Sequence, residues 1–152
     1  MAVEIVIATR NLKKFRELKA LLRHRHVRWR SLAEYAGVPA VREDGRSFEE
    51  NAIKKARIVA RAIRGLALAD DSGLEVAALR GAPGVRSARF AGRHGHAAAN
   101  TAKLLRLLRH APAARRRAQF RCVLALADSR RVLATTQGIL RGRIALEPNG
   151  RH

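Results

Sequence analysis

The sequence predicts an α/β domain with a mixed β-sheet and flanking helices. Largely apolar runs at residues 3–8, 66–69 and 120–127 have the length of buried strands, and the first of them is rich in β-branched residues. Two amphipathic patterns, at 12–22 and from 47 onward, separate the first strands, and such alternation of strands and helices is typical of this class. A chain of 152 residues can bury a substantial core, so we expect one domain spanning 1–152.

The first half of the chain alternates strand and helix. After the strand at 3–8, apolar residues recur near helical spacing across 12–22, which predicts a helix. Val27 and Trp29 then alternate with arginines, a pattern that predicts a strand with one solvated face.

The clearest predicted helix begins at Ser47. Ser47 and Glu50 have the spacing of a capping box, in which each side chain accepts a backbone N–H that the helix leaves without a partner. Gly65 is expected to end the helix. One apolar stripe is expected to face the core, formed by Ile53, Ala56, Ala60 and Ile63.

The second half of the chain is richer in predicted strands. Short strands are expected at 66–69 and 74–79, with a polar turn between them. A predicted helix at 97–108 precedes two further strands, at 120–127 and 132–136, and the turn formers Asp128 and Ser129 lie between these strands.

The net charge of +20 is the most unusual bulk property, with 32 Lys and Arg against 12 Asp and Glu. Such a charge favours polyanionic partners: nucleotides, nucleic acid or acidic membrane surfaces. Its scatter along an Ala-rich chain is better explained by a general bias toward Arg and Ala codons. The acids are more informative, because half of them fall in three adjacent pairs: Glu43-Asp44, Glu49-Glu50 and Asp70-Asp71.

The sequence favours a cytoplasmic protein without a membrane partner. No apolar run approaches the ~18 residues of a membrane span. The N-terminal run is interrupted by Glu4 and is too short for a signal peptide. A single cysteine cannot form an internal disulfide, which suits a reducing compartment.

Residues 9–14, Thr-Arg-Asn-Leu-Lys-Lys, lie where the first strand enters the first helix. The start of a helix binds anions, because free backbone N–H groups and the helix dipole point at the ligand. Thr9, Asn11 and the two lysines could add donors for phosphate oxygens. The alternative is an ordinary helix start, with Asn11 as N-cap and the lysines in solvent.

Asp70 and Asp71 are expected where a strand ends in a turn, ahead of Ser72 and Gly73. Two ionised carboxylates ~5 Å apart repel by about 3 kcal/mol at an effective dielectric constant of ~20, so such a pair requires a cation or a shared proton. Mg²⁺ suits the pair, because it takes carboxylates together with substrate phosphates. The alternative is a solvated turn, since Asp, Ser and Gly are all turn formers.

The motifs T-x-N-x-x-K at 9–14 and D-D-S-G at 70–73 resemble the inosine triphosphatase family of Mg²⁺-dependent pyrophosphatases. The likeness continues through 43–45, 47–48, 50–52 and 55–56, and later through 81–85, 87–92, 120–124, 142–144, 147–148 and Gly150. Arg42 departs from it, because the family often carries another acid there.

The resemblance implies the family's fold with a cleft, a homodimer, and hydrolysis of XTP, ITP and dITP to the monophosphate and pyrophosphate. It assigns Asp71 as the general base, and Glu43, Asp70 and Asp71 as the residues that hold Mg²⁺. It implies that the substrate is bound by Thr9, Arg10, Asn11, Leu12, Lys13, Lys14, Lys55 and Ser72.

The resemblance also implies that the last family elements, which contact the purine base, have no counterpart in 1–152. On this interpretation the domain is incomplete at its C-terminus, and its activity is either retained or impaired. Two non-enzymatic hypotheses remain open beside it. One is an inactive remnant whose basic surface binds nucleic acid non-specifically, and the other is a phosphate-binding regulator without turnover.

Overall fold

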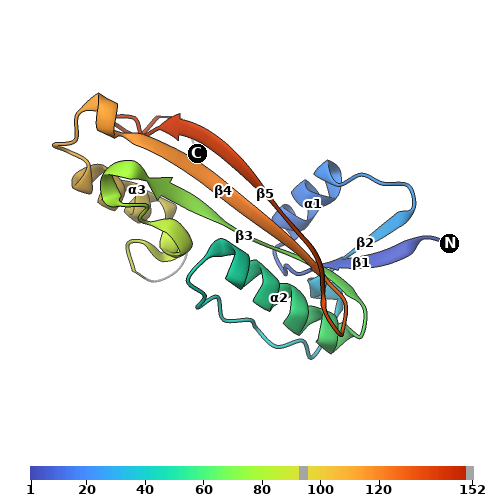
Figure 1. The fold of residues 1–152 in the computed structure, drawn as a ribbon. Coiled ribbons are helices and arrows are strands. Elements are labelled where there is room, and N and C mark those ends of the chain that lie inside the picture. Colours follow the sequence, from blue (N-terminus) through green and yellow to red (C-terminus); the bar gives the residue numbers. More distant parts are fainter. Residues whose placement is uncertain (93–95, 150–152) are drawn as a thin grey trace. The chain divides into compact units, whose positions relative to one another are not determined.

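A computed structural model of the chain describes residues 1–92 and 96–149. Within them a five-stranded sheet has the order β2-β1-β3-β4-β5 (Figure 1). Helices α1 (Leu12–Leu21), α2 (Phe48–Ile63) and α3 (Ala97–Leu107) flank it, so the predicted α/β class is confirmed. The strands are β1 (Val3–Ile7), β2 (Val27–Ser31), β3 (Leu66–Val76), β4 (Arg117–Ala127) and β5 (Val132–Arg143).

The chain divides into two compact units. The first comprises Met1–Asp71 and Val123–Thr136, and the second comprises Ser72–Cys122 and Gln137–His152. Strands β3, β4 and β5 contribute residues to both units. The expectation of a single domain over 1–152 stays a prediction.

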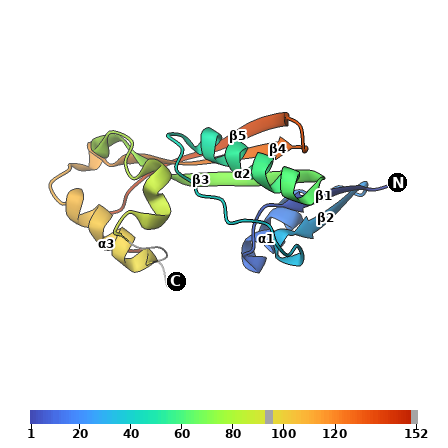
Figure 2. The same cartoon turned by 90° about the horizontal axis from the view of Figure 1, so that it is seen from below.

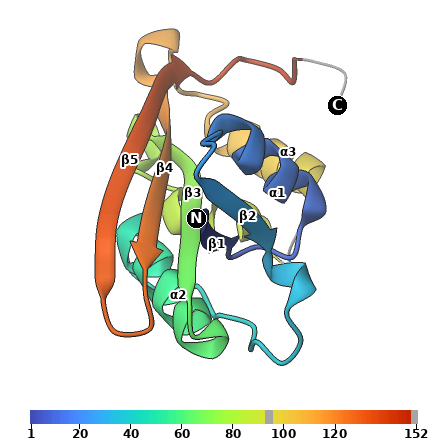
Figure 3. The same cartoon turned by 90° about the vertical axis from the view of Figure 1, so that its right-hand side faces the viewer.

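Parallel pairing of β1 with both β2 and β3 determines the architecture of the first unit. Because β2 and β3 lie on opposite sides of β1, the two crossover connections run in opposite directions across the sheet. Crossovers of this kind are right-handed, so α1 and α2 cover opposite faces of the sheet (Figures 2 and 3). Ile5, Val6 and Ile7 are accordingly all buried, as in a strand covered on both faces.

Strand β3 is longer than the sequence predicted. We expected two strands, 66–69 and 74–79, with residues 70–73 in a turn, but one strand runs from Leu66 to Val76 through the Asp-Asp-Ser-Gly segment. The turn prediction is wrong because pairing within the sheet outweighs the local turn preference of these residues. Strand β5 similarly runs to Arg143, beyond the predicted end at Thr136.

Helix α2 begins as predicted, with Ser47 as its N-cap and Ser47 Oγ accepting the Glu50 N–H at 3.1 Å. The Glu50 carboxylate reaches back to the N–H of Arg46 at 2.7 Å. At the other end, the left-handed residue is Arg64, with φ 52°, and not Gly65. The predicted stripe is partly correct: Ile53 and Ile63 are only half-buried, and the buried face consists of Phe48, Asn51, Ala52, Ala56, Val59 and Ala60.

The second unit has a core of its own, in which Val76, Leu104 and Leu108 are buried. Arg116 is also buried, and its guanidinium is satisfied by backbone oxygens. It donates to the carbonyls of Leu108 at 2.6 Å, Ile144 at 3.0 Å and Ala145 at 2.6 Å. These bonds tie the segment after β5 to the end of α3.

Helix α2 is the longest helix in the described part of the chain, and no helix there combines the length and hydrophobicity that a bilayer crossing requires.

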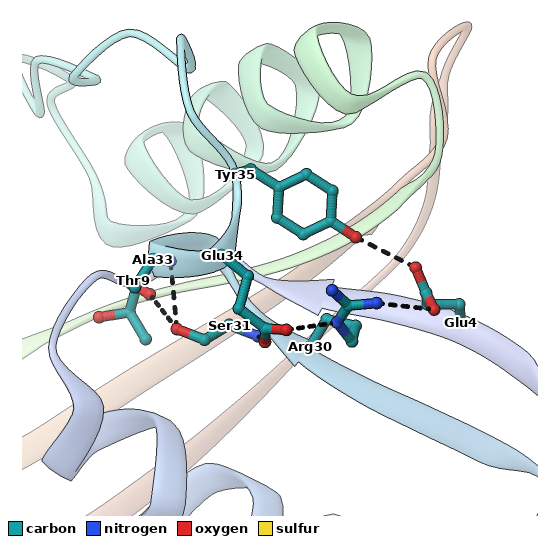
Figure 4. Close-up of polar contacts among 7 residues, drawn as sticks. All are labelled: Glu4, Thr9, Arg30, Ser31, Ala33, Glu34 and Tyr35. Atoms are coloured by element: carbon teal, nitrogen blue, oxygen red, sulfur yellow. Dashed lines mark hydrogen bonds and ion pairs between the residues drawn. The ribbon is translucent and has the colours of Figure 1, made fainter.

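A polar network joins β1, β2 and the turn after β2 (Figure 4). Arg30 Nε donates to Glu34 Oε2 at 2.6 Å, and Arg30 Nη1 lies 3.5 Å from Glu4 Oε2. Tyr35 Oη donates to Glu4 Oε1 at 3.1 Å, and burial together with this bond raises the pKa of Tyr35. Glu34 Oε1 also accepts the Ser31 N–H at 2.7 Å, which completes a capping box.

The Glu34 carboxylate makes the stability of the fold depend on pH. The Ser31 N–H, followed by Arg30, holds the pKa of Glu34 below its ordinary value of 4.5. A group whose pKa falls on folding contributes stability that is full above the unfolded pKa and is lost as the pH falls through the folded pKa. We therefore expect Glu34→Gln to lower the unfolding midpoint in urea at pH 7, with the difference from wild type shrinking as the pH falls below 4.5.

Glu17→Gln is the matched control, because Glu17 is exposed on α1 and makes no ion pair with a described residue. Its urea midpoint should follow that of the wild type throughout the pH range. A Glu34→Gln deficit of equal size at pH 3 and pH 7 would contradict the assigned role.

Candidate active site

The segment between β1 and α1 is held by its own side chains. Asn11 caps α1, and its Oδ1 accepts the backbone N–H groups of Lys13 at 3.0 Å and Lys14 at 3.2 Å. Thr9 Oγ1 accepts the Asn11 N–H at 3.1 Å. The helix-cap alternative for Asn11 is therefore confirmed, and phosphate contact by Thr9 and Asn11 stays a prediction.

Ser31 supports the same segment from β2. Its hydroxyl donates to the Thr9 carbonyl oxygen at 3.3 Å and accepts the Ala33 N–H at 3.2 Å (Figure 4). Ser31 is buried, with 3% of its surface exposed. The network around Arg30 thus supports the backbone of the 9–14 segment as well as the sheet.

Asp70 and Asp71 point to opposite faces of the sheet, because successive side chains alternate along a strand. Asp70 Oδ2 lies 2.6 Å from Lys14 Nζ of α1. Asp71 Oδ2 accepts a hydrogen bond of 2.8 Å from Asn51 Nδ2 of α2. The two adjacent carboxylates therefore have partners on different helices, and a metal-binding role for Asp70 and Asp71 stays a prediction.

Pairing between strands brings the 9–14 segment to Asp70. Ile7 is the register partner of Leu68, and the Ala8 N–H donates to the Leu68 carbonyl at 2.8 Å. The chain following β1 therefore lies beside the residues that follow Leu68. In open α/β sheets, ligands bind at the carboxyl ends of strands where crossovers change direction, and β1 ends at such a point.

Helix α2 connects β3 to the loop before the helix. Lys55 forms an ion pair with Glu43, and its Nζ also donates to the Asp70 carbonyl at 2.9 Å. One turn earlier on the same helix face, Asn51 Oδ1 accepts the Gly45 N–H at 2.7 Å, while its amide nitrogen donates to Asp71. Two α2 residues thus each bind the 43–45 loop on one side and the 70–71 segment on the other.

Asp44 pairs with Lys54 and not with Lys55, the partner of Glu43. Lys54 Nζ lies 2.5 Å from Asp44 Oδ1, and this contact lowers the pKa of the Asp44 carboxyl. Glu43 is half-buried and faces Lys55, whereas Asp44 is exposed. Of this acidic pair, only Glu43 lies on the side of α2 that faces β3.

The predicted residues therefore divide into two groups. Contacts within the first unit bring together Lys14, Glu43, Lys55, Asp70 and, through Asn51, Asp71. Of the others, Asn11 Oδ1 accepts the Lys14 N–H at 3.2 Å, and the Arg10 guanidinium donates to the Val38 carbonyl at 2.7 Å. Leu12 and Lys13 are exposed, and Ser72 begins the second unit.

Sequence reasoning missed the parts played by Asn51 and Gly45. Asn51 is fully buried, although it is polar and lies on the apolar face of α2. A Cβ on Gly45 would lie 2.6 Å from Asn51 Oδ1, so the residue must be glycine for the loop to approach this closely. The signal available in the sequence was a carboxamide within an apolar helix face, since buried polar groups require partners.

Glu43 and Asp71 are the candidate metal ligands, because their carboxylates lie on the α2 face and hard cations such as Mg²⁺ prefer oxygen ligands. The described residues contain no group of three or more His, Cys, Asp or Glu arranged to hold a metal. This donor set fits an ion that keeps several waters and binds substrate phosphates along with one or two carboxylates, as Mg²⁺ does.

A pocket of about 520 Å³ lies within the second unit and contains none of the predicted site residues. Glu75 is on its wall, and its carboxylate accepts hydrogen bonds from Gln119 at 2.6 Å and Arg121 at 3.2 Å. The pocket is lined by Glu75, Val76, Ala77, Gly81, Arg117, Ala118, Gln119, Arg141 and Gly142.

Comparison with known proteins identifies relatives along almost the whole chain. A family model described as the Ham1 family matches residues 5–152. A dITP/XTP pyrophosphatase of Desulforamulus reducens is 48% identical over 148 residues, which cover 97% of this chain and 74% of the relative. One of Geobacillus kaustophilus is 46% identical over 147 residues, which cover 97% of this chain and 72% of the relative.

Solved structures give the same result. A HAM1 protein from Coxiella burnetii matches with a TM-score of 0.89 at 41% identity, covering 99% of this chain and 77% of that one. A nucleoside-triphosphatase, dITP/XTP pyrophosphatase, from Mycobacterium abscessus matches with a TM-score of 0.86 at 42% identity, covering 97% of this chain and 78% of that one. The chain spans about three-quarters of the length of these proteins.

The ion pair between Lys14 and Asp70 should contribute to stability. The Asp70 side chain is 6% exposed and that of Lys14 is 38% exposed, so removal of the ammonium leaves a buried carboxylate without this counter-ion. Loss of one partner from a fully buried pair costs about 3–5 kcal/mol, and solvent screening at Lys14 reduces this, so Lys14→Met should lower the free energy of unfolding by about 1–3 kcal/mol. Urea denaturation of purified protein measures the effect.

Lys13→Met is the control for this measurement, because Lys13 is the exposed neighbour in the same helical turn. Equal losses of stability in the two variants would show that the ion pair does not stabilise the fold.

Proposed function

Since this chain belongs to the Ham1 family, we propose that it hydrolyses non-canonical purine nucleoside triphosphates, such as XTP, ITP and dITP, to the monophosphate and pyrophosphate. Relatives that are 48% and 46% identical are dITP/XTP pyrophosphatases, which supports this substrate class. The observation that carries the proposal is the double link made by α2, which holds Glu43 beside Lys55 and Asp71 beside Asn51.

The proposed cofactor is Mg²⁺, held by Glu43 and Asp71, with Asp70 adding negative charge from the other face of β3. When bound, the ion neutralises charge on the phosphate oxygens. Two carboxylates suit an ion such as Mg²⁺, which takes one or two carboxylates together with water and substrate phosphates.

The triphosphate is proposed to bind across the start of α1. Backbone N–H groups and the dipole at that helix end favour an anion there. Lys14 pairs with the Asp70 carboxylate, and Lys55 pairs with Glu43 and donates to the Asp70 carbonyl, so both lysines are proposed to contact phosphate oxygens. Thr9, Arg10, Asn11, Leu12, Lys13 and Ser72 complete the proposed contacts.

Asp71 is proposed as the general base. It takes a proton from a water molecule whose oxygen attacks the α-phosphorus, and the bond from that phosphorus to the bridging oxygen breaks to release pyrophosphate. The Asn51 amide donates to one oxygen of the Asp71 carboxylate at 2.8 Å and so orients the proposed base. Positioning and charge neutralisation are the main contributions of a site of this kind.

Two further properties belong to the same proposal. A homodimer is expected, and the cytoplasm is the expected location, because a single cysteine suits a reducing compartment. Size-exclusion chromatography with light scattering measures the first.

A second candidate function rests on the net charge of +20. Arg57, Arg61 and Arg64 form an exposed series along α2 and could contact nucleic acid backbones. Non-specific binding of this kind needs no metal. It predicts an affinity for any DNA duplex that falls steeply between about 50 and 200 mM salt. Fluorescence anisotropy with two unrelated duplexes tests it, and salt-independent or undetectable binding would contradict it.

The hydrolase proposal is tested by pyrophosphate release from ITP and XTP in the presence of Mg²⁺. Wild-type protein should turn over both, and Asp71→Asn should lower kcat by about 10²–10⁴-fold, because an amide cannot accept the proton. Asp128→Asn is a matched control in the connection between β4 and β5, where Asp128 Oδ1 accepts two backbone N–H groups at 2.7 Å. Equal rates for wild type and Asp71→Asn would exclude Asp71 as the base.

A further inference from the structure

Asn51 is the one fully buried polar side chain in the described first unit. Its carboxamide oxygen has two acceptor sites, and its nitrogen has two donor N–H groups. The oxygen binds the loop before α2, and the nitrogen binds β3. The oxygen accepts the Gly45 N–H at 2.7 Å, and the nitrogen donates to Asp71 Oδ2 at 2.8 Å. A single rigid amide therefore spans from the loop that carries Glu43 to the carboxylate on β3.

We propose that Asn51 is a positioning residue that sets the separation of Glu43 and Asp71, and with it the affinity of the site for a divalent cation. This inference rests on the proposed function. Asn51 is not itself proposed to contact the cation or the substrate. It acts through Asp71, which it orients directly, and through Gly45, which lies two residues after Glu43.

Residue types on both sides of the contact support this role. A Cβ on Gly45 would lie 2.6 Å from Asn51 Oδ1 and 3.0 Å from Glu50 Cβ, so only glycine lets the loop backbone reach the amide without displacement. An aspartate at position 51 would place a second carboxylate against Asp71, and an apolar residue would leave the Gly45 N–H without this acceptor. The asparagine carboxamide offers a donor and an acceptor on two separate atoms and carries no charge.

The helix makes the spacing rigid. Asn51 and Lys55 lie four residues apart on one face of α2, and both contact the 43–45 loop and the 70–71 segment. Because Ala52 and Ala56 beside them are fully buried, the helix face cannot retreat from β3 without opening the core. The side chains of Asn51 and Lys55 thus determine the separation between the 43–45 loop and the 70–71 segment of β3.

The test measures binding of Mn²⁺ without turnover. Binding of Mn²⁺ to the 152-residue protein, saturated with an α,β-methylene analogue of ITP, is followed by electron paramagnetic resonance. Partners that orient metal ligands typically contribute 10–100-fold in metal affinity. Asn51→Ala should therefore weaken Mn²⁺ binding by about 10–100-fold.

Gly45→Ala approaches the same contact from the loop side and leaves Asn51 in place. This second variant is needed because Asn51→Ala removes a buried amide and can unfold the protein. Gly45→Ala adds no backbone strain, since Gly45 does not have a positive φ. The added Cβ must displace the Asn51 oxygen, so this variant should also weaken Mn²⁺ binding. It decides the question if Asn51→Ala does not fold.

Asn100→Ala is the matched structural control. The Asn100 amide in the second unit likewise joins backbone segments, accepting the Ala91 N–H at 2.7 Å and donating to the Ser87 carbonyl at 3.2 Å. It should lower the melting temperature, as Asn51→Ala does, while leaving Mn²⁺ affinity unchanged.

Wild-type Mn²⁺ affinity in both Asn51→Ala and Gly45→Ala, with only the melting temperature lowered, would overturn the inference. If wild-type protein also releases pyrophosphate in that case, the proposed function stands and the positioning role alone fails. If wild-type protein neither binds Mn²⁺ with the analogue nor hydrolyses ITP, the proposed function and the inference both fail.

Discussion

The alternation of side chains along β3 is the constraint on which the site depends. Asp70 and Asp71 are neighbours in sequence, yet one contacts Lys14 of α1 and the other contacts Asn51 of α2. This division follows from the topology, because two right-handed crossovers in opposite directions place α1 and α2 on opposite faces. Each carboxylate therefore meets its own helix, and two adjacent acids can serve different purposes.

Local signals in the sequence were sufficient for part of this arrangement. The predicted starts of α1 and α2 are correct, because Asn11 and Ser47 are N-caps and capping involves only nearby residues. The path of the chain through Asp70 and Asp71 was predicted wrongly, since Asp, Ser and Gly favour turns locally and only pairing with distant strands keeps them extended.

The bridge made by Asn51 could not be predicted for a related reason. It depends on the distance between the loop at Gly45 and the strand at Asp71, and both lie beyond the helix on which Asn51 resides. A sequence pattern shows that a polar residue falls on a buried helix face, but tertiary structure decides which groups satisfy it. Lys55 illustrates the same limit, because its position on that face was predictable and its two simultaneous partners were not.

The end of α2 has a consequence for protein engineering. The chain turns there through Arg64, which adopts a left-handed conformation at φ 52° with an exposed side chain. A residue with a Cβ pays roughly 1–2 kcal/mol for that conformation, and glycine does not. Arg64 has no proposed role in hydrolysis. Replacing it with glycine is therefore expected to raise thermal stability without changing the carboxylates or the face of α2 that contacts them.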